Sequence, residues 1–170
     1  MRVIAGTARG VPLKAPKGER TRPTADRVKE SLFGIIGARV IDADVLDLFA
    51  GTGALGIEAL SRGARRAVFV ESDRRVAEIL RQNLKKCRLE EVATLVVKRL
   101  PPHSSLPGDW PPFDLVLMDP PYEEGLVAPT LEWLVRDRLV KAGGWVVVEH
   151  SAKEEIPSRL QNLSLIRTKA

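Results

Sequence analysis

The stretch VLDLFAGTGALG, residues 45–56, decides the fold, because an apolar run passes directly into a glycine-rich loop. Val45–Phe49 has the composition of a short buried strand, and the glycines that follow it open an expected helix. Glu71 ends the next apolar run about 20 residues further on. This spacing is typical of a nucleotide-binding strand–helix–strand unit, in which glycines let the backbone approach a ligand closely.

The chain continues as an alternation of short apolar runs and amphipathic stretches. This alternation predicts an α/β fold with a mostly parallel twisted sheet flanked by helices. The expected strands are Val45–Phe49, Ala67–Glu71, Thr94–Val97, Asp114–Met118 and Trp145–Glu149.

Three helices are expected besides the one that follows the glycine loop. Asp73–Lys86 is the clearest, because Asp73 is a good N-cap and apolar residues recur after it at helical spacing. A second is expected from about Pro129 to Lys141, where the pair Gly143-Gly144 would stop it. The third would begin at a Thr24 cap and carry an apolar face made of Val28, Leu32, Ile35 and Ile36.

The composition is that of one globular domain. A chain of 170 residues with 44% hydrophobic residues can bury a substantial core. The single Cys87 excludes an internal disulfide, and two His with one Cys leave no zinc set, so we expect a reducing, cytoplasmic setting and no metal. No apolar run approaches the roughly 18 residues of a membrane span, so no membrane association is expected.

The positive charge is concentrated at the N-terminus. Residues 1–40 hold nine Lys/Arg against three Asp/Glu, whereas residues 41–170 hold eighteen against nineteen. Arg2–Arg22 is also rich in Gly and Pro, which predicts a short basic arm or hairpin over residues 1–23. Clustered cations beside a neutral body favour contact with a phosphate backbone, although a solvated tail has the same composition.

Two carboxylates bear on the ligand of the glycine loop. Glu71, at the end of its strand, can accept hydrogen bonds from both hydroxyls of a ribose, as in NAD or S-adenosylmethionine. Asp47 lies in the strand before the loop, where it would repel a pyrophosphate and attract the ammonium of a methionine moiety. The pair therefore favours S-adenosylmethionine, while Asp47 could instead cap amides of its own loop and Glu71 could be a solvated acid.

Asp119-Pro120-Pro121-Tyr122 follows the apolar run Phe113–Met118 and should lie at the carboxyl end of a central strand. Two successive prolines remove two backbone donors and leave carbonyls that only accept. Asp119 and the Pro120 carbonyl are expected to accept hydrogen bonds from an exocyclic base amine, and Tyr122 to stack on the base. The tetrapeptide could be a simple turn, but its place after an apolar strand predicts a site for an amine on a flat ring extruded from its stack, while Asp47 and Glu71 indicate the methyl donor.

Taken together and in this order, four groups of residues resemble the bacterial small-subunit ribosomal RNA guanine-N2 methyltransferases called RsmD. These groups are Arg2–Gly6 with Arg9-Gly10, Arg22–Thr24 with Asp26–Val28, Asp47–Gly53, and Asp119–Tyr122. The resemblance implies a Rossmann-like class I methyltransferase domain over residues 24–170. It also implies S-adenosyl-L-methionine as donor, S-adenosyl-L-homocysteine as product, and 16S rRNA in an assembling small subunit as partner of a monomeric enzyme.

The same resemblance assigns roles to individual residues. Cofactor binding falls to Asp47, Phe49, Ala50, Gly51, Gly53, Glu71 and Ser72, and guanine binding and catalysis to Asp119, Pro120 and Tyr122. Contact with RNA falls to the basic residues Arg2, Arg9, Lys14, Arg20, Arg22 and Arg27. Val97–Leu100 departs from the family pattern, since an acid or amide that contacts adenine is usual there. Similar proteins also continue into a last antiparallel strand where this chain reaches Ala170, so we expect an exposed sheet edge or a further segment.

Three alternatives remain open on the sequence. The Asp-Pro-Pro-Tyr chemistry is shared with methyltransferases that act on DNA adenine-N6 or cytosine-N4. A basic RNA-binding assembly factor without catalysis would carry the same arm. A nicotinamide dehydrogenase would share the glycine loop, but Asp47 argues against it.

Overall fold

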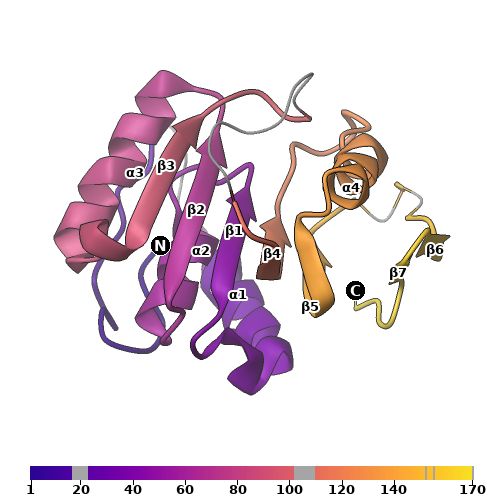
Figure 1. Ribbon diagram of the computed structural model, residues 1–170. Coiled ribbons are helices and arrows are strands. Elements are labelled where there is room, and N and C mark those ends of the chain that lie inside the picture. The colour runs from indigo at the N-terminus through magenta and orange to yellow at the C-terminus, as the bar shows by residue number, and fades with distance from the viewer. Residues whose placement is uncertain (17–22, 102–109, 152, 155, 170) are drawn as a thin grey trace.

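The computed structural model describes residues 1–16, 23–101, 110–151, 153–154 and 156–169. A five-stranded sheet has the order β3-β2-β1-β4-β5, and every pair in it is parallel. Its strands are β1 (Asp44–Leu48), β2 (Arg66–Glu71), β3 (Ala93–Val97), β4 (Phe113–Met118) and β5 (Val140–Val148). The predicted Rossmann-like architecture and all five predicted strands are confirmed, four of them to within one residue at each end (Figure 1).

Four α-helices and several short elements complete the described chain. The helices are α1 (Pro23–Ile36), α2 (Ala54–Ser61), α3 (Arg74–Cys87) and α4 (Val127–Arg136). Short 3-10 turns are η1 (Gly37–Val40) and η2 (Glu90–Val92), and a separate antiparallel pair is formed by β6 (Arg159–Leu160) and β7 (Leu163–Ser164). Among these helices none is long and apolar enough to cross a membrane.

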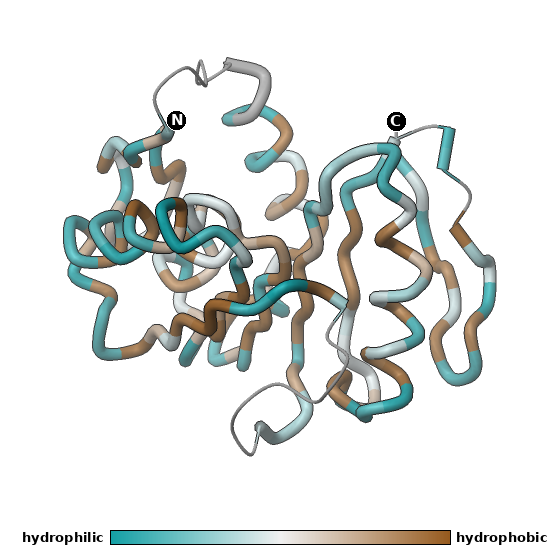
Figure 2. Tube along the Cα trace, turned by 90° about the horizontal axis from the view of Figure 1, so that it is seen from above, coloured by the Kyte–Doolittle hydropathy of each residue, from teal (hydrophilic) through white to brown (hydrophobic). Residues whose placement is uncertain are grey.

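The sheet buries hydrophobic side chains on both faces, as a parallel sheet requires. Val45, Phe69 and Leu115 face α1, α2 and α3 in one core cluster. Leu46 and Val116, the next residues along their strands, pack in a second cluster that includes the α4 side chains Val127, Leu131 and Leu134. Viewed from above, the turns of α3 and α4 alternate between hydrophilic and hydrophobic, as expected for helices that cover a core (Figure 2).

The strand order reverses beside β1, which is the topological switch point of this sheet. The chain moves outward from β1 through β2 to β3 and then returns to β4 on the other side of β1. Leu48 and Met118 are partners in register, so the carboxyl ends of β1 and β4 open side by side. Open α/β sheets bind ligands in the crevice at such a point.

Residues 1–16 of the predicted arm form a hairpin that packs on the helices. Arg2 and Pro12 form an antiparallel bridge, and the Val3 amide donates to the Val11 carbonyl at 3.0 Å. Ala8 and Leu13 are buried, with Val3, in the same core cluster as α1, α2 and α3. The hairpin is therefore held by its own hydrophobic side chains as well as by polar contacts.

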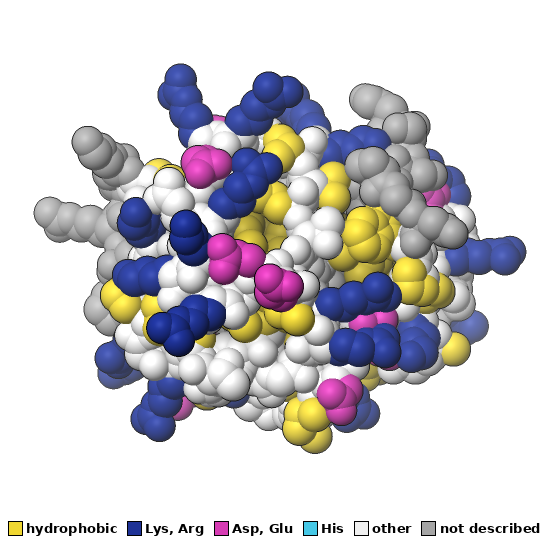
Figure 3. Space-filling model, turned by 60° about the vertical axis from the view of Figure 1, so that its left-hand side comes forward, with side chains coloured by type: hydrophobic (Ala, Val, Ile, Leu, Met, Phe, Trp, Pro, Cys, Tyr) yellow, Lys and Arg dark blue, Asp and Glu magenta, His cyan; other side chains and the backbone are white. Residues whose placement is uncertain are grey.

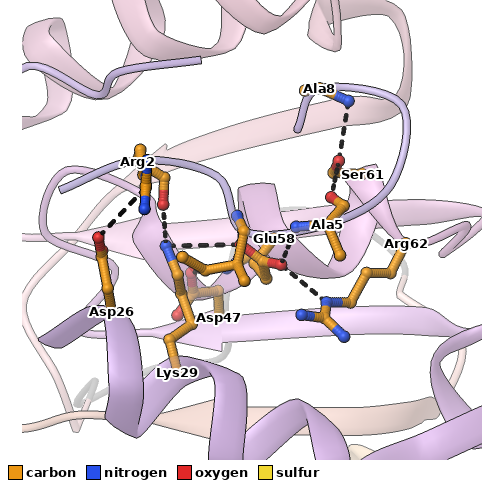
Figure 4. Close-up of polar contacts among 11 residues, drawn as sticks. Arg2, Ala5, Ala8, Asp26, Lys29, Asp47, Glu58, Ser61 and Arg62 are labelled. Carbon is orange, nitrogen blue, oxygen red and sulfur yellow. Dashed lines mark hydrogen bonds and ion pairs between the residues drawn. The ribbon is translucent and has the colours of Figure 1, made fainter. Parts of the chain in front are cut away.

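A buried ion pair fastens this hairpin to α1 and α2 (Figure 4). The Glu58 carboxylate accepts from the Ile4 amide at 2.8 Å and from the Ala5 amide at 3.0 Å. Lys29 lies 3.5 Å from the same carboxylate and donates to the Arg2 carbonyl at 2.6 Å. Burial lowers the pKa of Lys29, and the charge of Glu58 opposes that shift. Lys29 is therefore a buried, paired cation and does not contribute to the positively charged surface of the N-terminal segment.

The predicted apolar face of α1 was partly wrong. Val28 is 43% exposed, whereas Lys29, Phe33 and Ile36 are buried. The buried face is rotated because Lys29 replaces an apolar residue at a core position, where Glu58 compensates its charge. The helix also begins at Pro23, so Thr24 lies in its first turn and not at the cap.

The predicted boundary between the last helix and the last strand was also wrong. α4 ends at Arg136, because Arg138 takes a left-handed conformation with φ 53° and the Leu139 amide donates to the Leu134 carbonyl. β5 then begins at Val140 and contains Gly143-Gly144, which lie at an irregularity in its pairing with β4. A Cβ on Gly144 would lie 3.0 Å from the Phe113 carbonyl oxygen, so the glycine permits close strand packing and does not stop a helix.

Candidate functional site

A cleft of about 990 Å³ opens at the carboxyl ends of the strands. It brings together two groups of predicted residues that are far apart in the sequence. From β1, the glycine loop and the end of β2 come Asp47, Phe49, Ala50, Gly51, Glu71 and Ser72, and from the segment after β4 come Asp119, Pro120 and Tyr122. Gly53 is not among the lining residues and lies at the N-cap of α2.

The glycine loop turns sharply because several of its residues have positive φ. Phe49, Gly51 and Gly53 have φ of 59°, 54° and 85°, and the Gly53 amide closes the turn on the Ala50 carbonyl at 2.8 Å. Gly56 has a different role inside α2. A Cβ there would lie 2.3 Å from the Phe69 ring and 2.8 Å from Asp47 Oδ2, so Gly56 lets α2 lie directly on the sheet.

Asp47 lies under this loop and is 2% exposed. Its Oδ2 accepts from the Gly56 amide at 2.8 Å, which is the amide-capping role considered from the sequence, and the residue also lines the cleft. Burial raises the pKa of Asp47 well above its ordinary value; the Gly56 amide opposes this shift, and the charges of Asp119 and Glu71 add to it. A cationic ligand group beside Asp47 would favour the ionised carboxylate.

Glu71 joins the two loops on either side of it. Its Oε2 accepts from the Gly51 amide and its Oε1 from the Asp73 amide, both at 2.8 Å. An ionised carboxylate offers about four acceptor positions, so Glu71 retains capacity to accept from ligand hydroxyls. Asp73 also accepts from the Arg75 amide at 2.7 Å, which confirms its predicted cap of α3.

Asp119 directly follows β4 and faces the cleft. Burial by the surrounding protein, with repulsion from Glu149 as the smaller cause, raises the pKa of Asp119 to about 6, although the residue as a whole is exposed and lines the cleft. Pro120 behind it is buried and fixes the turn. At neutral pH this site presents a carboxylate that can both accept a hydrogen bond and take up a proton.

Tyr122 lies on the open side of the same turn and is 55% exposed. Its hydroxyl donates to Glu149 Oε1 at 2.8 Å. This hydrogen bond, with burial and the nearby negative charges of Glu149 and Asp119, raises the pKa of Tyr122 to about 12. The sequence interpretation had placed Glu149 only as the end of a strand, although a carboxylate at a strand end is the signal that identified Glu71.

Some of the other lining residues come from segments that the sequence did not assign to the site, or assigned with a different residue type. Lys98 and Arg99 line the cleft after β3, in place of the usual acid or amide. Met1 and Pro16 bring both ends of the N-terminal hairpin to the cleft. Within the described chain, no group of His, Cys, Asp and Glu is arranged to hold a metal ion.

The predicted RNA-binding residues are spread along the hairpin and α1. Arg2, Arg9, Lys14 and Arg27 are exposed, and Arg20 and Arg22 lie outside the described residues. Arg2 and Lys14 are close in sequence to the cleft-lining Met1 and Pro16, whereas the turn that carries Arg9 contacts Ser61 at the far end of α2. Among the charged side chains on the face shown in Figure 3, Lys and Arg predominate over Asp and Glu.

Comparisons with known proteins agree with this geometry. Residues 1–170 match the model of a family described as conserved hypothetical protein 95. Ribosomal RNA small subunit methyltransferase D of Escherichia coli K12 is 36% identical over 169 residues, covering 99% of this chain and 84% of the relative. The protein of the same name from Haemophilus influenzae is 36% identical over 171 residues, covering 99% and 88%. A solved structure of the candidate methyltransferase yhhF from Escherichia coli has a TM-score of 0.78 and 36% identity, covering 100% of this chain and 91% of that one.

Proposed function

Because this chain belongs to the RsmD family, whose model is described as conserved hypothetical protein 95, we propose that it is a small-subunit rRNA methyltransferase that uses S-adenosylmethionine. We further propose the N2 amine of a guanine in 16S rRNA as the methyl acceptor. The observation that carries the proposal is that one cleft at the switch point is lined both by the glycine loop with Asp47 and Glu71 and by the turn with Asp119 and Tyr122.

The residues beside the glycine loop fit the donor by their chemistry. Asp47 offers a buried negative charge for an ammonium, and Glu71 offers acceptors for ribose hydroxyls. When bound, S-adenosylmethionine supplies an electrophilic methyl group on a sulfonium. Lys98 and Arg99 at the β3 end supply no acceptor side chain for an adenine amine, so the adenine is held there without the usual acid or amide.

The turn after β4 fits the amine acceptor. The lone pair of an exocyclic amine is delocalised into the base, so the amine needs acceptors on its N–H groups. Asp119 and the Pro120 carbonyl accept from these groups and orient the lone pair toward the methyl for in-line transfer. After transfer, Asp119 takes up the proton that the amine loses, which its pKa of about 6 permits.

A base in folded RNA reaches this cleft only when it is extruded from its stack. The exposed face of Tyr122 then replaces the lost stacking by about 1–3 kcal/mol. Arg2 and Lys14, close to the cleft-lining ends of the hairpin, hold the phosphates that flank the extruded nucleotide.

The deciding experiment compares methyl transfer to naked DNA, naked 16S rRNA and small ribosomal particles that lack methylation, with labelled S-adenosylmethionine. The methylated nucleoside is then identified by mass spectrometry, and Asp119→Ala serves as the inactive control. N2-methylguanosine in rRNA supports the proposal, from either RNA substrate.

Incorporation into DNA alone would instead identify a DNA methyltransferase. Calorimetry distinguishes the assembly-factor alternative, because a functional cofactor site binds in the roughly micromolar range. No binding at millimolar S-adenosylmethionine would favour a factor without catalysis.

A further inference from the structure

The loops after β4 and β5 are joined beside the cleft by three contacts. The Glu149 amide donates to the Met118 carbonyl at 2.8 Å, which extends the pairing of the two strands to their ends. The Tyr122 hydroxyl donates to Glu149 Oε1 at 2.8 Å. One residue further along the first loop, Glu123 pairs with Lys153 at 3.3 Å.

Tyr122 needs such a contact because little else restrains its ring. The residue follows the rigid pair Pro120-Pro121 and precedes Glu123, which has a left-handed φ of 62°. Its side chain is more than half exposed, so packing restrains the two side-chain torsions weakly. A hydrogen bond at the far end of the ring restricts both torsions at once.

Glu149 is well placed to provide that restraint. It is only partly exposed, and its backbone continues the register of β5 against β4. A hydrogen bond to a carboxylate is roughly twice as strong as one between neutral groups. Tyr122 lines the cleft, whereas Glu149 is not among the described lining residues and contacts the tyrosine through the hydroxyl at the end of its ring.

We propose that Glu149 is a positioning residue for methyl transfer, which holds the Tyr122 ring in the orientation that receives the target base. The proposal rests on the proposed function, because it gives the ring a base to stack on. It also assigns the Tyr122 hydroxyl to the protein and leaves the ring face to the substrate. The raised pKa of Tyr122, about 12, agrees with a phenol that remains the donor at every physiological pH.

The hydrogen bond can be tested without any activity, because Tyr122 is the single tyrosine of the chain. Its ionisation can be followed by absorbance at alkaline pH in the whole protein. In Glu149→Ala the phenol should ionise at lower pH than in the wild type, toward the ordinary value of about 10. Titration curves that coincide would show that the contact does not form in solution, and the proposal would fail.

The role in methyl transfer is tested by a double-mutant cycle on kcat/KM for rRNA at saturating cofactor. Glu149→Ala and Tyr122→Phe should each lower kcat/KM by about tenfold, and the double variant by no more than either alone. Glu149→Gln should recover most of the loss, because its amide oxygen still accepts from the phenol. Lys153→Ala is the matched control. It removes the Glu123–Lys153 ion pair, which is the second side-chain contact described between the same loops, and should leave kcat/KM unchanged.

Each contrary result has a distinct meaning. Losses that multiply to about a hundredfold in the double variant would show that Glu149 does not act through Tyr122. If Lys153→Ala lowered kcat/KM as much as Glu149→Ala does, Glu149 would act only by holding the two loops together and not by orienting Tyr122. A wild-type protein that methylates no RNA would overturn the proposed function, while the tyrosine titration would still report on the hydrogen bond.

Discussion

Asp119 is the residue on which the proposed chemistry depends, and its ionisation gives a pH prediction. The raised pKa of about 6 leaves roughly tenfold more carboxylate than acid at pH 7. Only the carboxylate can accept from the amine and then take up its proton, so kcat/KM should fall as the pH drops through about 6. Burial and the charge of Glu149 raise this pKa, and the charge of Asp119 in turn raises the pKa values of Asp47 and Tyr122.

A variant tests whether this limb of the profile belongs to Asp119. Glu149→Gln removes the second cause of the raised pKa and leaves burial, so the midpoint should move to lower pH without disappearing. The measurement is the pH profile of methyl transfer in both proteins. A midpoint that stays in place in the variant would assign the titration to another group.

Asp119→Ala separates the role of this carboxylate from cofactor binding. The substitution should lower turnover by well over tenfold, because the amine loses its acceptor, and should leave the Kd for S-adenosylmethionine nearly unchanged. Single-turnover methyl transfer and calorimetry measure the two quantities. Turnover within about tenfold of wild type, or ~1.4 kcal/mol of barrier, would contradict the assigned role.

At the scale of single elements, α2 lies close to the sheet because it carries Gly56. Gly56→Ala would bring a Cβ to 2.3 Å from the Phe69 ring, and the helix would have to move away from Asp47 and the glycine loop. We expect a loss of about 1–3 kcal/mol in the free energy of unfolding and weaker cofactor binding.

Gly34→Ala is the matched control, since Gly34 lies in α1 with no atom within 4 Å of the added Cβ. It should stabilise the protein by about 0.5–1 kcal/mol through helix propensity. Urea unfolding measures both variants. If Gly56→Ala raised the free energy of unfolding as much as Gly34→Ala does, the close approach of α2 to the sheet at Gly56 would carry no cost.

The docking of the hairpin on α2 gives a second prediction at this scale. Glu58→Ala would leave the buried Lys29 without its salt-bridge partner and the Ile4 and Ala5 amides without an acceptor. Because removal of one partner of a buried ion pair is costly, unfolding should become easier by about 3–5 kcal/mol. Hydrogen exchange at the Ile4 and Ala5 amides should accelerate as the hairpin detaches.

Glu78→Ala provides the comparison for this variant. Glu78 pairs with Arg81 on α3, where both side chains are more than half exposed. A surface pair of this kind contributes less than about 1 kcal/mol, so the free energy of unfolding should hardly change. A similar loss in both variants would mean that burial adds nothing to the Glu58 contacts.

The elements show where sequence patterns suffice and where they do not. Central strands were predicted to within a residue, because burial on both faces produces continuous apolar runs such as Phe113–Met118. The end of α4 was not predicted. The left-handed residue that follows a helix is usually Gly or Asn, whereas here it is Arg138. The buried Lys29 was also missed, because its partner Glu58 is distant in the sequence and belongs to another helix.

At the scale of the whole molecule, the hairpin and the glycine loop belong to one connected structure. The Asn83 side chain on α3 is fully buried and donates to the carbonyl oxygens of Thr52 in the loop and Lys14 in the hairpin. It also accepts from the Lys14 amide at 2.8 Å. Residues 1–16 of the basic segment are thus joined to the elements around the cleft, and Met1 and Pro16 contribute to the cleft itself.

The part of the candidate site that could be predicted from the sequence is the set of carboxylates at or near the ends of expected strands. Asp47, Glu71 and Asp119 each lie in or directly after an apolar run, and a parallel sheet brings such ends to one edge. The contributions of Met1 and Glu149 depend on which segments fold back to that edge. Strand order and hairpin docking determine those neighbours. Glu149 has the same strand-end position as Glu71, but no local pattern in the sequence pairs it with Tyr122.

The distribution of cations over the whole molecule gives the last prediction. Arg2→Gln, Arg9→Gln and Lys14→Gln together remove three exposed charges from the hairpin without touching its buried contacts at Glu58 and Asn83. Each lost phosphate contact lowers the slope of log K against log salt by about 0.7–0.9, so the triple variant should bind rRNA more weakly and with a slope flatter by about two.

The control replaces three exposed cations that follow or belong to α4 and β6, Arg136, Arg138 and Arg159, by Gln. Arg136 is paired with Asp137 as Arg2 is with Asp26, so both triple variants lose one paired charge and two others. Net charge is the same in the two variants, and only the position of the lost charges differs. Filter binding from low to high salt measures the slope for both variants. A flatter slope in the hairpin variant alone places the RNA backbone along the hairpin. Equal slopes in the two variants would show that the hairpin cations are solvated and do not contact RNA.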